Sequence, residues 1–81
     1  GLTIGRGSDA DIRINDPGIS RLHARVNVWP QGDGIGLSIE DLNSTNGVSV
    51  NGVKVSSAEI SDGSRIEIGS TRMLVHSPTG M

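Results

Sequence analysis

A hydroxyl, a guanidinium and an imidazole occur within four residues of this sequence, at Ser20, Arg21 and His23. A Pro-Gly pair, which favours a turn, precedes them. Residues 23–29 follow and alternate between apolar and polar side chains, a pattern typical of a half-buried strand. The three groups therefore lie where a loop enters a strand, a common location for binding and catalytic residues. Two kinds of chemistry are open to them: nucleophilic catalysis and the binding of an anion.

Catalysis would use Ser20 as the nucleophile and His23 as its base. The sequence around Ser20 lacks the second glycine of a nucleophile elbow. Asp16 is the only nearby carboxylate that could orient the imidazole, and no oxyanion hole is evident. His23 and His76 are far apart in the sequence and belong to no cluster of metal ligands. We therefore predict that the chain is not an enzyme and holds no metal ion.

Two further polar segments carry groups that bind anions or peptide backbones. Gly5-Arg6 ends one short apolar run, and the Ser-Thr-Asn-Gly segment at residues 44–47 follows another. Residues 5–10 also fit the G-x-G-x-x-A fingerprint of dinucleotide-binding folds, but that fingerprint requires a helix directly after it. Residues 11–14 alternate like a strand instead. We therefore predict a flexible loop that carries Arg6, and no cofactor.

The elements that must position these segments are short strands. Two valine-rich runs flank Asn51-Gly52, which is the signature of a hairpin with a type I′ turn. No window of eleven residues holds a helical period. Strands are predicted over residues 2–5, 11–14, 23–29, 37–40, 48–50, 53–55, 65–68 and 72–75, with a glycine-rich turn over residues 30–36 and a loop over residues 59–64.

This spacing of strands and turns predicts an all-β protein, either a β-sandwich or a small barrel. Eighty-one residues make a single small domain. We assign the domain to residues 1–76. Residues 77–81 begin a C-terminal linker, because Ser, Pro, Thr and Gly succeed one another there.

Composition excludes several classes of partner. The chain has seven Lys and Arg and nine Asp and Glu, which gives a formal net charge of −2. A nucleic-acid or acidic-membrane binder needs a basic field, and Trp29 is the only aromatic residue that could stack on a base. No apolar run reaches transmembrane length, and no secretion signal opens the chain. We expect a cytoplasmic protein that binds neither nucleic acid nor membranes.

Taken in order, the polar motifs resemble those of the forkhead-associated (FHA) domain, a phosphothreonine-binding module. The family pattern is Gly-Arg, then Ser-x-x-His, then Asn-Gly with a second Asn-Gly shortly after; here these are Gly5-Arg6, residues 20–23, Asn46-Gly47 and Asn51-Gly52. Each motif is weak alone, whereas the ordered set is specific and covers nearly the whole chain. The resemblance implies an antiparallel β-sandwich of the FHA type. Its first strands precede the Gly-Arg motif, so they are expected before Gly1, missing from this sequence.

The chemistry of the side chains agrees with phosphate binding. A phosphoryl group carries about −1.5 to −2 charge at neutral pH and offers three strong acceptor oxygens. Arg6 can donate charge-assisted, bidentate hydrogen bonds to it. Ser20 and Thr45 can donate their hydroxyls to phosphate oxygens, and Arg21 can add a cationic or backbone donor.

The remaining site residues are expected to hold the peptide or to support the loops. Asn46 carries amide donors and a carbonyl acceptor, so it can hold the peptide backbone beside the phosphorylated residue, as the matching asparagine does in the family. By resemblance, His23 is structural and braces its loop from behind. Gly5 is likewise expected to be structural, allowing close packing beneath Arg6. Gly47 is expected to adopt a positive φ. Taken singly, each residue also fits an ordinary surface loop.

We therefore predict that the partner is a threonine-phosphorylated protein or peptide, in trans or as a flanking segment of the same protein. A Ser/Thr kinase would act upstream. Some relatives place an arginine two residues before the serine of the Ser-x-x-His motif, where it reads an acidic side chain; this chain has Gly18 there, so that preference is not carried over. The alternative is a phosphate-independent docking or self-association module that uses a sheet face.

Overall fold

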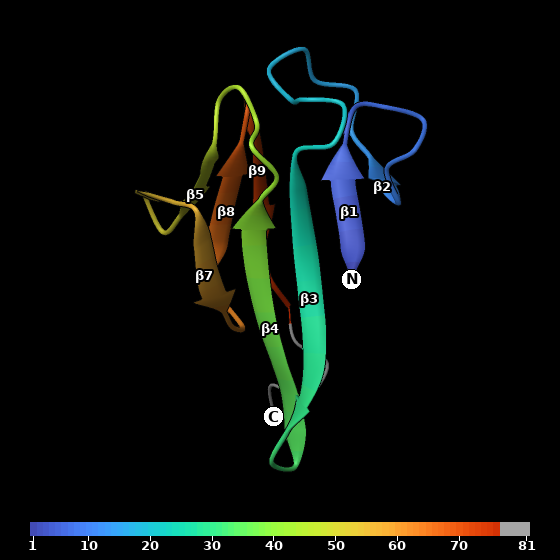
Figure 1. Cartoon of the computed structure of the whole chain (residues 1–81). Helices are drawn as coiled ribbons and strands as arrows, with labels where there is room; N and C mark the ends of the chain where they lie inside the picture. Colours follow the sequence, from blue (N-terminus) through green and yellow to red (C-terminus); the bar gives the residue numbers. More distant parts are fainter. Residues whose placement is uncertain (77–81) are drawn as a thin grey trace.

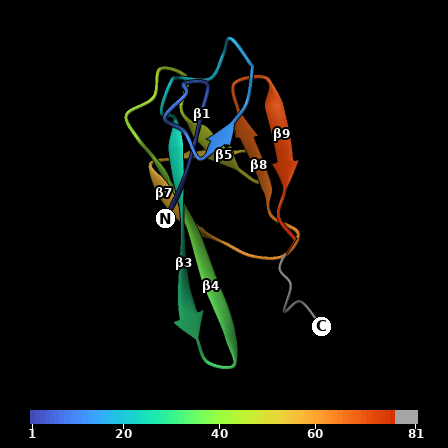
Figure 2. The same ribbon diagram turned by 90° about the vertical axis from the view of Figure 1, so that its right-hand side faces the viewer.

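The computed structural model describes residues 1–76 and folds them into two β-sheets packed face to face (Figure 1, Figure 2). The five-stranded sheet has the order β2 (Ile12–Arg13), β1 (Leu2–Gly5), β3 (Ala24–Gln31), β4 (Gly34–Asp41) and β7 (Ser57–Ile60). The four-stranded sheet has the order β6 (Val53–Val55), β5 (Val48–Val50), β8 (Arg65–Ile68) and β9 (Thr71–Leu74). The predicted all-β sandwich is confirmed. No helix of these 76 residues is long and apolar enough to cross a membrane.

The core is a layer of aliphatic side chains between the two sheets. Their period-two spacing places one set on the inner face of each strand. Most are β-branched, which suits a pleated and half-buried surface. Each valine or isoleucine contributes about 1.5–3 kcal/mol when it leaves water. The buried apolar residues are Ile4, Ile19, Ala24, Ile39, Val48, Val50, Ile60, Ile66 and Ile68.

Strand pairing is antiparallel with one exception among the described residues. β1 and β2 pair in parallel over two residue pairs, Ile4 with Ile12 and Gly5 with Arg13. The predicted antiparallel sandwich is therefore corrected at this edge. The predicted hairpin is present: β5 and β6 flank Asn51 and Gly52, whose φ angles of 51° and 86° are both positive, as a type I′ turn requires.

The predicted turn over residues 30–36 is wrong. β3 continues to Gln31 and β4 begins at Gly34, so that only two residues form the turn. Gly36 lies in β4 opposite Trp29, and a Cβ there would meet the indole ring at 2.3 Å. Glycine inside a strand can mark such a close approach rather than a break, and the closely spaced glycines were misread as a loop.

The predicted loop over residues 59–64 is wrong in its first part. β7 runs from Ser57 to Ile60 and pairs with β4. Its Ala58 and Ile60 pack toward the core, while the polar residues that alternate with them, Ser57 and Glu59, are exposed. Serine, alanine and glutamate have weak β propensity, so pairing with β4 rather than local preference makes this strand.

Two expectations concern the ends of the chain. The linker predicted at residues 77–81 lies outside the described residues. The strands expected before Gly1 stay a prediction.

Candidate functional site

Three loops gather at one end of the sandwich, at the top of Figure 1, and Figure 2 shows the same gathering from the side. They are the β1–β2 loop (residues 6–11), the β2–β3 loop (residues 14–23) and the β4–β5 loop (residues 42–47). These loops carry the site residues predicted from the sequence, from Arg6 to Gly47, apart from Gly5, which ends β1. Segments far apart in the sequence therefore meet at one surface.

Arg6 is tied to the β2–β3 loop by its backbone and by one side-chain nitrogen. Its amide donates to the carbonyl of Ser20 at 3.0 Å, and its Nε donates to the carbonyl of Ile19 at 3.1 Å. The side chain is exposed, and its two terminal nitrogens have no partner among residues 1–76. The guanidinium is thus held at one nitrogen and keeps a pair of donors for a ligand.

Gly5 lies directly beneath the segment that follows Ser20. A Cβ at Gly5 would lie 2.0 Å from the carbonyl oxygen of Arg21. The amide of Gly7 donates to the same carbonyl oxygen at 3.0 Å, so a hydrogen bond also joins the β1–β2 loop to this segment. Arg21 itself is exposed, and its side chain has no partner within residues 1–76.

His23 is fully buried and uses both ring nitrogens. The amide of Ser20 donates to Nδ1 at 2.9 Å, so Nδ1 is the acceptor and the proton lies on Nε2. Nε2 then donates to the carbonyl of Gly47 at 2.7 Å. The imidazole therefore joins the β2–β3 loop to the β4–β5 loop from inside the molecule.

Ser20, Thr45 and Asn46 form the outer joint between the same two loops. The amide of Thr45 donates to Oγ of Ser20 at 3.1 Å, and Nδ2 of Asn46 donates to the carbonyl of Gly18 at 2.8 Å. Oγ of Ser20 accepts in this contact, so its own hydrogen remains available. The hydroxyl of Thr45 has no partner among the described residues, and Thr45 and Asn46 are exposed.

The β4–β5 loop is closed by its own hydrogen bonds. Ser44 donates through its amide and its hydroxyl to Oδ1 of Asp41, and the amide of Gly47 donates to Oγ of Ser44 at 2.9 Å. Gly47 has φ of 81°, which confirms the predicted positive φ. The stem of Lys54 covers it, since a Cβ at Gly47 would lie 2.5 Å from Cε of Lys54.

A comparison with protein families decides what kind of domain this is. The model of the FHA domain matches residues 2–69. This chain belongs to the FHA domain family.

Two curated relatives and a solved structure agree with this assignment. FhaA, an FHA domain-containing protein of Mycobacterium tuberculosis, is 42% identical over 72 residues, which are 89% of this chain and 13% of FhaA. The glycogen accumulation regulator GarA of Mycolicibacterium smegmatis is 34% identical over 70 residues, 86% of this chain and 42% of GarA. The chain thus spans less than half the length of either relative. A structure from an analysis of phosphothreonine-dependent FHA domain interactions has a TM-score of 0.82 and 39% identity, covering 93% of this chain and 74% of that one.

The FHA domain is a non-catalytic binding module, in agreement with the prediction that this chain is not an enzyme. The geometry gives the chemical reason. A base must contact the hydroxyl that it activates, but the imidazole of His23 contacts the amide of Ser20, and the Ser20 hydroxyl contacts Thr45. Both imidazole nitrogens are already engaged.

The sequence analysis assigned no supporting role to two residues that contact the three loops, Arg13 and Asp16. Nε of Arg13 donates to the carbonyl of Arg6 at 3.2 Å, so a second guanidinium is anchored beside the first loop. Asp16 is 8% exposed and accepts from Gly18, Ser70 and Thr71. The Asp-Pro-Gly order did signal the first of these contacts, because Asp commonly bonds the amide two residues on. Nothing local signalled the contacts to residues 70 and 71.

The hydrogen bonds to Asp16 also fix its ionisation. The amide of Gly18, followed by the hydroxyl of Thr71, holds the pKa of Asp16 below its ordinary value. The amide and hydroxyl of Thr3 lower the pKa of Asp11 in the same way. Both carboxylates are therefore anionic at neutral pH, and both accept hydrogen bonds from donors within the domain.

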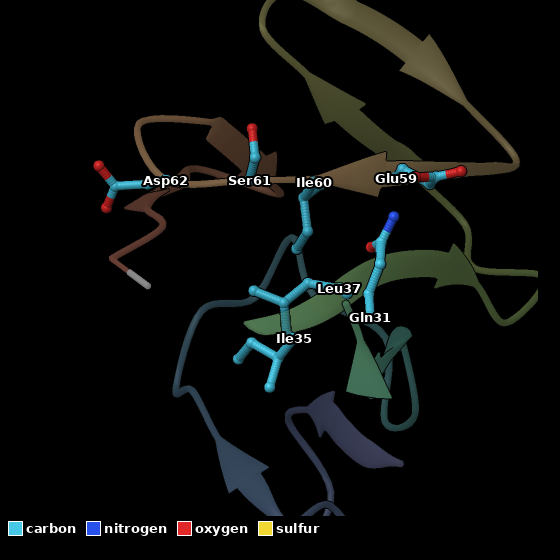
Figure 3. A pocket seen from close by; sticks show the side chains of 8 residues that line it. Gln31, Ile35, Leu37, Glu59, Ile60, Ser61 and Asp62 are labelled. Carbon is cyan, nitrogen blue, oxygen red and sulfur yellow. The ribbon is translucent and has the colours of Figure 1, made fainter. Parts of the chain in front are cut away.

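A cavity of about 300 Å³ lies at the opposite end of β3 and β4 from the three loops (Figure 3). Two acidic residues, Glu59 and Asp62, line it, and no basic residue does. Such a lining does not suit an anion. Within residues 1–76, no three His, Asp or Glu side chains gather closely enough to hold a metal ion.

Proposed function

We propose that this FHA domain binds a phosphorylated threonine at the surface formed by its three loops. The observation that carries the proposal is that some donor groups of the site residues are hydrogen-bonded within the domain while others are left over for a ligand. The backbones of residues 18–20 hold Arg6 and Asn46 in place, while the remaining donors face no partner among the described residues. A phosphate dianion needs such a set of convergent, fixed donors.

Each predicted residue has a defined part in this proposal. The terminal nitrogens of Arg6 pair with two phosphate oxygens. The hydroxyls of Ser20 and Thr45 donate to the phosphate, and Arg21 adds charge at the rim. Asn46 keeps its carbonyl oxygen and one amide hydrogen for the peptide backbone, since its other amide hydrogen is used by Gly18.

His23, Gly5 and Gly47 hold these donors in place and do not touch the ligand in this proposal. His23 is buried and both its nitrogens are engaged. Gly5 leaves room for the Arg21 backbone. Gly47 supplies the positive φ that returns the chain to β5. Preorganisation of this kind lowers the cost of binding, because the loops do not have to order around the ligand.

The partner that we infer is a threonine-phosphorylated protein, or a phosphorylated segment that flanks this domain in a longer chain. A Ser/Thr kinase must supply the phosphate, and we place the domain in the cytoplasm, where such kinases have ATP. Selection of threonine over serine would come from an apolar niche for one methyl group, which is worth about 1–3 kcal/mol.

The test compares two arginine substitutions in binding to a phosphothreonine peptide. Arg6→Ala should weaken binding by about 2–5 kcal/mol, because the phosphate loses its paired charge. Arg65→Ala is the matched control: its side chain is exposed on β8 in the four-stranded sheet, and among the described residues only its backbone forms hydrogen bonds, through an amide that donates to Oδ1 of Asn51 and a carbonyl that accepts from the amide of Asn51. The control should bind within about 0.5 kcal/mol of the parent. Isothermal titration calorimetry measures both.

Equal binding of phosphorylated and unphosphorylated peptides by the parent domain would contradict the proposal. That result would favour the alternative, a phosphate-independent module that docks through a sheet face. An affinity of Arg6→Ala equal to that of Arg65→Ala would contradict the assigned role of Arg6.

A further inference from the structure

Asp16 links the β2–β3 loop to the four-stranded sheet, whose strands that loop does not connect. It lies in the β2–β3 loop, and its Oδ1 accepts from the amide of Gly18 at 2.8 Å. Its Oδ2 accepts from the amide of Ser70 and from the hydroxyl of Thr71, both at 2.8 Å. These two donors lie in the β8–β9 turn, 54 and 55 residues further along the chain. Figure 2 shows that turn beside the β2–β3 loop.

The two segments also touch backbone to backbone. A Cβ at Gly69 would lie 2.9 Å from the carbonyl carbon of Gly18, and a Cβ at Gly18 would lie 3.1 Å from Cα of Gly69. Ile19, next to Gly18, is 1% exposed and belongs to the core. The hydrogen bonds of the Asp16 carboxylate therefore join the β2–β3 loop to the β8–β9 turn where the two segments are already close-packed, and they leave the loop little freedom to shift.

This joint bears directly on the proposed site through three successive carbonyls. The carbonyl of Gly18 accepts from Asn46, that of Ile19 from Nε of Arg6, and that of Ser20 from the amide of Arg6. The positions of Arg6 and Asn46 therefore depend on where residues 18–20 lie. Asp16 fixes the start of that segment against the four-stranded sheet.

We propose that Asp16 is a positioning residue for phosphopeptide binding, which holds the carbonyls of residues 18–20 where Arg6 and Asn46 need them. This proposal rests on the function proposed above. Charge alone would give the opposite effect, because a carboxylate near the site repels a phosphate dianion. Geometry and charge therefore predict opposite signs for the same substitution.

The test is Asp16→Asn, measured by calorimetry with a phosphothreonine peptide at a temperature where parent and variant are both folded. The asparagine keeps an oxygen for the amide of Gly18, but the amide nitrogen that replaces Oδ2 can accept from neither Ser70 nor Thr71. We expect affinity to fall about tenfold, the scale of one lost charge-assisted hydrogen bond. The amide resonances of Ser20 and Asn46 should shift in two-dimensional NMR spectra of the free domain.

Asp33→Asn is the matched control. It also removes one negative charge, and Asp33 lies in the β3–β4 turn, at the opposite end of the molecule from the three loops (Figure 1). Its affinity should stay within about twofold of the parent, a change typical of a surface substitution. Thr71→Val removes one of the two far donors without a change in charge, and it should weaken binding by a smaller factor than Asp16→Asn.

The outcomes separate the possibilities. A folded Asp16→Asn that binds as tightly as the parent, with only a lower melting temperature, would mean a merely structural role and would overturn the proposal. Tighter binding would mean that charge dominates and would also overturn it. If Asp16→Asn does not fold, Thr71→Val decides, and parent-like affinity in that variant overturns the proposal. A parent domain that does not bind the peptide refutes the proposed function, and this inference with it.

Discussion

The residue whose surroundings define its role most fully is His23. It accepts from one loop and donates to another, with no exposed surface. An imidazole does this because its two nitrogens have opposite character in the neutral ring. The role expected from the family, bracing from behind the site, matches this geometry. Its place in the site stays a prediction until a variant is measured.

Substitution of His23 by alanine should lower the free energy of unfolding by about 2–5 kcal/mol. The change leaves the amide of Ser20 and the carbonyl of Gly47 without partners and opens a cavity. Urea denaturation at neutral pH measures the loss. His76→Ala is the control, because His76 is the chain's other histidine and is exposed. Equal stability of the two variants would show that the buried hydrogen bonds contribute little.

Elements were predictable from the sequence where local chemistry determined them. Asn51-Gly52 predicted the hairpin, and the period-two spacing of apolar residues predicted most of the other strands. β7 was missed because its pairing with β4 is long-range. The start of β4 was misread as a turn because the reason for Gly36, its close contact with the Trp29 ring on the neighbouring strand, is not visible in the sequence. The order of motifs in the sequence predicted which loops meet. The contacts of Asp16 with residues 70 and 71 could not be predicted, since no local pattern encodes which turn packs against which loop.

The end of β1 offers a test of how closely strand and ligand loop must approach. Gly5→Ala places a Cβ 2.0 Å from the Arg21 carbonyl oxygen, so that the backbone itself must move. We expect the variant to lose about 1–3 kcal/mol of stability, as overpacking does, together with most of its phosphopeptide affinity. Gly7→Ala is a graded comparison, because its Cβ would lie 3.1 Å from the same oxygen. Chemical denaturation and calorimetry should rank the two, and a larger loss for Gly7→Ala would refute the packing argument.

At the scale of the whole molecule, two acid-dependent processes should occur at different pH. The pKa values of Asp16 and Asp11 lie below their ordinary value of 3.8, chiefly because of the amides of Gly18 and Thr3. A lowered pKa in the folded state adds stability above the unfolded pKa, and this stability is lost as pH falls through the folded values. The stability contributed by these two carboxylates should therefore stay level from neutral pH to about pH 4 and decline below it. Asp16→Asn should begin lower and decline less, as calorimetry across that range would show.

Phosphopeptide binding should weaken at a higher pH than folding does. The phosphate loses its second charge near pH 6, where the carboxylates that stabilise the domain are still ionised. Between about pH 4 and 6 the domain should therefore be folded but bind weakly. Because the titrating group belongs to the ligand, a difluoromethylene phosphonate analogue, whose second pKa is lower, should move the binding midpoint to lower pH. Titration of both peptides from pH 5 to 8, with melting measured in parallel, separates the causes: a midpoint that does not move would assign the titration to the protein, and an affinity independent of pH would argue against direct contact with the phosphate.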